Sequence, residues 1–145
     1  MTSDRAGNGR NEVRIHAEAG FAEFVWRGEI NRDTLMDAYD RAAAHLEWRP
    51  YFNRLSVFEV DMSVGDVDFD AVREIRQAVD DWQAQHAPGE RIYAANLVLS
   101  PFAEVLASVW AALPRDSDRL CVQVFRTRPA ALEWLDSVRR APPAA

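Results

Sequence analysis

Apolar and polar residues alternate near the start of the chain. Val13, Ile15 and Ala17 are apolar, and the residue after each of them is polar. A period of two residues is typical of a β-strand with one exposed face. A short Ala19-Gly20 turn and a second strand-like segment at 21–28 follow. The pattern therefore predicts an N-terminal β-hairpin, over 13–18 and 21–28, whose first strand lies at the edge of a sheet.

Four later segments repeat apolar residues every three or four positions, which is typical of amphipathic helices. The first two end before prolines 50 and 88, the third reaches about position 113, and the fourth reaches about position 138. Each begins at a residue type that commonly caps a helix. These expected caps are Asn31, Asp68, Ser100 and Thr127.

Strands are expected between the helices, at 55–60, 92–99 and 120–125. The last two are so apolar that both of their faces should be covered. Strands joined through helices must cross over and pair in parallel. The sequence thus predicts an α/β fold with a mixed, mostly parallel five-stranded sheet, an N-terminal β-hairpin and about four helices on its two faces.

Composition adds the domain organisation. With 145 residues, of which 48% are hydrophobic and 28% charged, the chain is long enough for one domain. Residues 1–11 are polar and glycine-containing, so we expect a disordered lead. Residues 12–140 form the expected domain, and 141–145 a tail outside the core.

Charge narrows the functional classes. The chain has 17 basic residues, all of them arginine, and 23 acidic residues. The resulting net charge of −6 argues against nucleic acid as a partner. The chain has neither a secretory leader nor an apolar run near 18 residues, so we expect no membrane span and a cytoplasmic location. The absence of lysine excludes Schiff-base and phosphate-loop lysine chemistry, and the single cysteine excludes a disulfide framework.

The acidic stretch at 61–70 follows a predicted strand, where open α/β sheets bind ligands. It does not fit a calcium loop, because Ala71 and Gln77 stand where such a loop needs glycine and glutamate. Caps at Asp68 and Asp70 explain it better. The three histidines are far apart and Cys121 lies in a predicted buried strand. We therefore expect no metal, no cofactor and no catalytic residues.

Asn96 breaks the pattern of an otherwise apolar strand. A buried amide costs free energy unless its hydrogen bonds are made, so Asn96 is either structural or lines a cavity. Ser100 lacks the glycines of a nucleophile elbow and fits a helix cap. As contacts of a ligand or partner, the sequence suggests residues at strand ends and helix starts: Asp61, Ser63, Asn96, Ser100, Phe102 and Thr127.

The order of elements resembles that of SpoIIAA-like proteins, bacterial relatives of STAS and SEC14-like domains. The resemblance covers about 13–139 and is carried by Gly28-Glu29-Ile30-Asn31, by Ser100-Pro101 and by the ending Phe125 … Ala131-Leu132-Glu133-Trp134-Leu135. It implies a compact α/β domain that is usually not an enzyme. Ser63 lies where such proteins carry a phosphorylation loop, but its neighbours depart from that motif.

These observations leave three hypotheses about the function, of which the first two are the main ones. The first is a non-enzymatic binding or regulatory domain with a protein partner, in which phosphorylation of Ser63 next to Asp61 would change partner affinity. The second is a carrier of a small apolar or lipid-like ligand, with Asn96 or Ser100 orienting its polar end. The third, an enzyme, rests only on the acidic loop. A homodimer stays open as an alternative.

Overall fold

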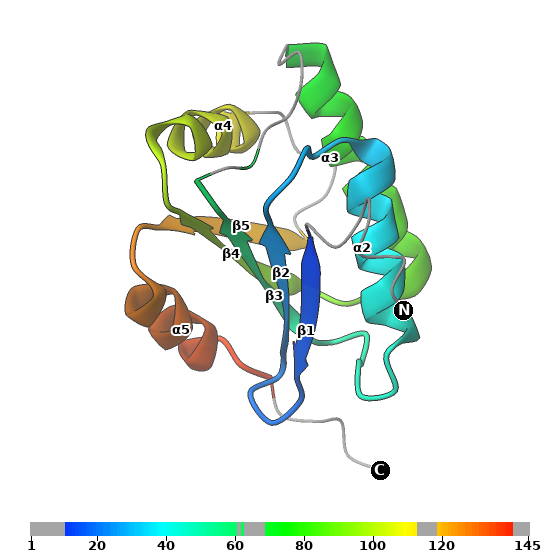
Figure 1. Cartoon of the computed structure of the whole chain (residues 1–145). Helices are drawn as coiled ribbons and strands as arrows, with labels where there is room; N and C mark the ends of the chain where they lie inside the picture. Colours follow the sequence, from blue (N-terminus) through cyan, green and yellow to red (C-terminus); the bar gives the residue numbers. More distant parts are fainter. Residues whose placement is uncertain (1–10, 61, 63–68, 113–118, 141–145) are drawn as a thin grey trace.

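The computed structural model describes residues 11–60, 62, 69–112 and 119–140. They form an α/β domain in which strands and helices alternate after an initial hairpin (Figure 1). The strands are β1 (Glu12–His16), β2 (Phe21–Trp26), β3 (Asn53–Phe58), β4 (Ile92–Val98) and β5 (Leu120–Phe125). The helices are α2 (Arg32–Ala44), α3 (Phe69–His86), α4 (Pro101–Ala112) and α5 (Arg128–Ser137).

The five strands lie side by side in the order of the chain, β1-β2-β3-β4-β5. β1 pairs with β2 antiparallel, and the other neighbours pair in parallel. Each helix between parallel strands connects one strand to the next in the same direction, and crossovers have one hand, so α2, α3 and α4 share one face of the sheet. Helix α5 follows the last strand and covers the opposite face (Figure 1).

The sheet therefore separates two packed layers. On the face towards α2, α3 and α4, here called the three-helix face, β2 contributes Ala22, Phe24 and Trp26 to the larger core cluster. On the face towards α5, here called the α5 face, Leu55 and Leu97 belong to a second cluster that α5 completes. Side chains alternate between these layers along every strand.

The structure confirms the predicted α/β class and the five-stranded, mostly parallel sheet with its hairpin. Element ends differ by a few residues. Helix α2 stops at Ala44 rather than near Pro50, because His45 has an extended backbone. Asn11, which the sequence placed in the lead, is buried, and its side-chain oxygen accepts a hydrogen bond from Arg27 N at 3.0 Å.

Three of the predicted caps, Asn31, Ser100 and Thr127, accept a backbone hydrogen bond at the start of their helices, and the fourth, Asp68, lies outside the described residues. Asn31 Oδ1 accepts a hydrogen bond from Thr34 N at 2.9 Å, and Thr34 Oγ1 accepts one from Asn31 N at 3.0 Å. This reciprocal pair satisfies two donors at the start of α2. Thr127 Oγ1 likewise accepts from Ala130 N at the start of α5.

Candidate functional site

A pocket of about 100 Å³ lies between the three-helix face of the sheet and the helices above it. Residues of β2, β3, β4 and β5 form its floor, and residues of α2, α3 and α4 form its walls. Aromatic rings contribute to the walls and floor, among them Trp26, Tyr39 and Trp110. All but three of the described residues that line it are apolar or aromatic. A concave, mostly apolar surface with a few polar groups is typical of small-molecule sites.

The three polar lining residues are Arg54, Ser56 and Asn96, here called the polar patch. Arg54 and Ser56 lie two positions apart on β3, so both side chains project from the same face. Asn96 on β4 is the direct register partner of Ser56. Because residues two apart in a strand are separated by about 7 Å and neighbouring strands by about 5 Å, the three side chains start from one small area of the floor.

Arg54 is buried, with 6% of its surface exposed. Its neighbours in register, Ala22 and Ala94, are small and leave space for its long side chain. The guanidinium carbon lies 5.0 Å from the ring centroid of Tyr39 and 5.6 Å from that of Trp82. Such cation–π contacts contribute about 0.5–2 kcal/mol each.

The guanidinium of Arg54 nevertheless has unmet hydrogen-bonding capacity. Its Nη1 atom is buried and has no hydrogen-bond partner among the described residues. Within the same part of the chain, no carboxylate forms an ion pair with it. Removing a charge from water costs several kcal/mol, and the contacts with aromatic rings do not replace conventional hydrogen bonds to oxygen acceptors. The guanidinium of Arg54 can therefore donate hydrogen bonds to a ligand on the pocket side of the sheet.

Other donors border the same space. Ser56 is 8% exposed, and neither its hydroxyl nor the Asn96 amide is hydrogen-bonded to a described residue. Trp110, on α4, also lines the pocket, and its indole N–H is buried without a described partner. No aspartate or glutamate is among the described lining residues. The lining is thus rich in donors and lacks a described negative charge.

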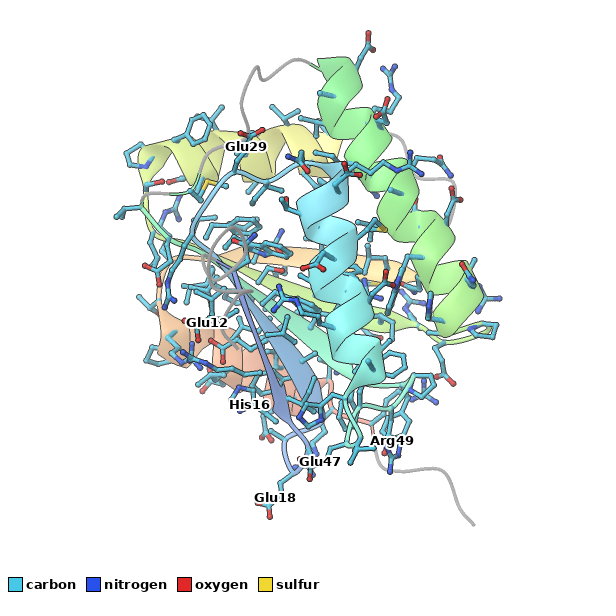
Figure 2. The ribbon with its side chains drawn as sticks, turned by 45° about the vertical axis from the view of Figure 1, so that its right-hand side comes forward. Glu12, His16, Glu18, Glu29, Glu47 and Arg49 are labelled. Atoms are coloured by element: carbon cyan, nitrogen blue, oxygen red, sulfur yellow. The ribbon has the colours of Figure 1, made fainter. Side chains whose placement is uncertain are left out.

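The α5 face holds a buried charge of the opposite sign. Glu23, on β2, is 1% exposed and receives two hydrogen bonds from the Arg128 guanidinium, at 2.9 and 3.0 Å. His16 Nε2 lies 2.7 Å from Glu23 Oε1 and its ring stacks on Phe21. His16 belongs to β1 beside the hairpin turn that carries Glu18 (Figure 2).

These partners determine the ionisation of Glu23. Burial is the largest influence and by itself raises the pKa of the carboxyl group. The hydrogen bonds from Arg128 and His16, together with their positive charges, outweigh it, so the pKa of Glu23 lies below its ordinary value of 4.5. The negative charge of the Glu23 carboxylate is therefore compensated by side chains of the folded chain.

The structure places three of the sequence-suggested contacts at the ends of elements or in the pocket. Asn96 lines the pocket. Ser100 Oγ accepts a hydrogen bond from Ala103 N at 3.1 Å, and the Thr127 hydroxyl accepts one from the backbone of α5. Ser100 and Thr127 therefore act as helix caps, and neither is among the pocket residues.

Of the other three suggested contacts, the structure describes only Phe102. Phe102 is 44% exposed on α4 and does not line the pocket. Asp61 and Ser63 lie outside the described residues. The regulatory interpretation of Ser63 therefore stays a prediction.

Sequence reasoning did not find Arg54 and Ser56. The strand was expected to begin at Leu55, which placed Arg54 in a loop, whereas β3 begins at Asn53. A signal was present, because Arg54, Ser56 and Phe58 occupy alternate positions. Continuing that alternation backwards from the apolar strand would have placed Arg54 on the same face as Ser56.

The described residues contain neither a cluster of metal-ligating side chains nor a helix that could span a membrane. No three histidine, cysteine, aspartate or glutamate side chains in this part of the chain gather closely enough to hold a metal ion. None of its helices has the length and apolar character needed to cross a membrane.

Comparison of the chain with protein-family models, with curated proteins and with solved structures finds no match. The resemblance to SpoIIAA-like proteins therefore stays a prediction. The function has to be argued from the pocket itself.

Proposed function

We propose that this protein binds a small organic molecule in the pocket between the sheet and helices α2, α3 and α4, as a carrier or a sensor. The observation that carries the proposal is the combination of an apolar pocket with three polar side chains on its floor. Arg54, Ser56 and Asn96 line the pocket, and no described residue satisfies their hydrogen bonds there. An apolar wall contributes affinity, and a few placed polar groups orient the ligand.

The volume indicates the size of the bound group. An engineered apolar cavity of about 150 Å³ accommodates benzene. A pocket of about 100 Å³ is of the same order. It suits one ring or a short aliphatic chain rather than a two-chain lipid.

The proposal concerns binding because of the chemistry of the lining. Among the described lining residues there is no carboxylate, imidazole or thiol that could take a proton from a substrate. The described polar groups can hold and orient a molecule through their donors.

A cavity-filling substitution tests the proposal. Ala107, on α4, lines the pocket and is 7% exposed. In Ala107→Leu the added carbon atoms occupy the space of the ligand, so we expect the protein to fold and to lose binding. Ala84→Leu makes the same chemical change on the exposed surface of α3 and serves as the matched control.

Binding is measured by titrating the protein with small ring and chain compounds while following tryptophan fluorescence and thermal unfolding. Trp26 and Trp110 line the pocket, so occupancy should change their emission. We expect saturable binding to the wild type and to Ala84→Leu, with a rise in the unfolding temperature. Equal binding to Ala107→Leu, or no binding to the wild type, would contradict the proposal.

A further inference from the structure

We infer that the molecule held in this pocket carries one carboxylate, which pairs with the guanidinium of Arg54. This inference rests on the proposed function and names the chemical class of the ligand. It is drawn from the only cation among the described lining residues and from what surrounds that cation.

The charge of Arg54 calls for an anion. A guanidinium stays protonated in proteins and has donors but no acceptor. Arg54 is 6% exposed, and no described carboxylate pairs with it. Its contacts with Tyr39 and Trp82 involve its charge, and its buried Nη1 has no hydrogen-bond partner among the described residues. A neutral ligand would leave this charge uncompensated, whereas an anion would satisfy both the charge and the buried Nη1.

The geometry of the donors favours a carboxylate. The planar fork of a guanidinium matches the two oxygens of a carboxylate in a bidentate pair. The Ser56 hydroxyl and the Asn96 amide, one row further along the floor, add neutral donors. Donors of this kind stabilise the oxygens of an anion and add no second charge.

The remainder of the lining limits the anion to a single charge. Apart from the polar patch, the described lining is apolar or aromatic, so a second negative charge would have no counter-ion there. A phosphate monoester, which carries nearly two charges at pH 7, would leave most of one uncompensated. With a volume of about 100 Å³, the ligand is a small aromatic or short-chain monocarboxylate.

The test compares two pairs of probes on the wild-type protein at pH 7. Benzoate is compared with benzamide, and hexanoate with hexanamide, because each amide keeps the size of its acid but replaces the anionic oxygen with an N–H donor. Dissociation constants are measured by tryptophan fluorescence and by calorimetry. We expect at least one acid to bind tenfold or more tightly than its amide.

Two variants then assign this preference to Arg54. Arg54→Met keeps a long side chain and should reduce the ratio of acid to amide affinity to about one, without abolishing binding of the amide. Arg14→Met makes the same change in net charge at an exposed arginine on β1 and should leave the ratio as in the wild type. Far-ultraviolet circular dichroism shows whether each variant is folded.

The outcomes separate this inference from the proposed function. If acids and amides bind the wild type equally, the carboxylate inference is overturned and the binding function stands. If no acid and no amide binds, both are overturned. If Arg54→Met keeps the preference for acids, the assignment to Arg54 is overturned. The first comparison needs no variant, so its result does not depend on whether a substitution unfolds the protein.

Discussion

Two buried charged side chains lie on opposite faces of the same sheet, on neighbouring strands. Glu23, on β2, faces α5 and is bound by Arg128 and His16. Arg54, on β3, faces the pocket, and its Nη1 has no described partner. Both side chains are nearly removed from solvent, at 1% and 6% exposure. One charge is compensated within the fold, and the other is not compensated by any described residue.

The difference distinguishes a buried charge with a structural role from one with a proposed role in ligand binding. A buried ion pair with complete hydrogen bonds offsets much of its desolvation cost, so Glu23 is explained by the folded chain alone. A buried cation with unmet donors is retained at a cost to stability, and such a cost is commonly found at binding sites. The contrast predicts that matching substitutions on the two faces change stability in opposite directions.

The largest effect should come from Arg128→Met on the α5 face. This change leaves the Glu23 carboxylate almost fully buried, with His16 as its remaining side-chain partner. Removing one partner of a fully buried pair costs about 3–5 kcal/mol, but the Arg128 side chain is 43% exposed and solvent screens the pair. We therefore expect the free energy of unfolding to fall by about 2 kcal/mol. Urea unfolding at pH 7 measures it. Arg14→Met, which removes an exposed ion pair on β1, should cost less than about 1 kcal/mol. Equal losses in the two variants would show that the buried pair is no more important than a surface one.

The pH dependence of stability sharpens the same point. The folded-state pKa of Glu23 lies below its ordinary value of 4.5, so the unfolded chain binds the proton more readily. The contribution of Glu23 is therefore fully present well above 4.5 and is lost as the pH falls through that value towards the folded-state pKa.

We expect the stability of the wild type to fall between pH 6 and pH 3, and that of Glu23→Gln to fall less steeply. Unfolding in urea at several pH values gives both slopes. The pKa of Glu12 is lowered in the same direction, through Arg14 and Arg27, so some slope should persist in the variant. Identical slopes in the two proteins would mean that Glu23 titrates alike in the folded and unfolded states.

A smaller effect of opposite sign is expected on the pocket face. Arg54→Met replaces a buried charge, which no described residue compensates, with an apolar side chain of similar length. Replacing buried charges with apolar residues is often neutral or stabilising. Some cation–π energy with Tyr39 and Trp82 is lost, so we expect a net gain of about 1 kcal/mol in the free energy of unfolding. Urea unfolding without added ligand measures it. A loss as large as that of Arg128→Met would place Arg54 among the structural charges.

The sequence predicts the layers of this molecule better than its buried charges. Apolar patterns, together with cap, turn and proline residues, located every strand and helix described above, and β5 has the expected bounds. Those predictions succeed because burying an apolar face dominates the folding of each element. The burial of Glu23 and Arg54 is not predicted in this way, because a charged residue within a strand pattern is normally assigned to solvent.

Asn96 is the residue of the pocket that could be recognised from the sequence alone. Its neighbours on β4 are so apolar that its amide stands out, and the cavity-lining alternative agrees with its place in the pocket. Its pairing with Ser56 could not be predicted, because the register of two parallel strands depends on how the intervening helix packs. Arg54 belongs to the site because it shares a face of β3 with Ser56, and it was missed because β3 begins two residues before the expected start at Leu55.

The smallest effects compare the caps of one helix on each face. The cap at Asn31 on α2 is reciprocal and has a 2.9 Å hydrogen bond, whereas Thr127 on α5 forms a single bond of 3.4 Å. A longer bond contributes less, so we expect Asn31→Ala to cost about 1 kcal/mol and Thr127→Ala about 0.5 kcal/mol. Thermal and urea unfolding measure both.

The same two variants also test whether Thr127 is more than a cap. Its hydroxyl caps α5, which packs on the face opposite the pocket, so Thr127→Ala should leave the affinity for benzoate unchanged. Thr127→Ser keeps a hydroxyl at the cap and should recover most of the lost stability. A drop in benzoate affinity that exceeds the one in Asn31→Ala would require the two faces of the sheet to be coupled, because Thr127 does not line the pocket. If Thr127→Ala and the wild type bind benzoate with equal affinity, ligand recognition is confined to the three-helix face.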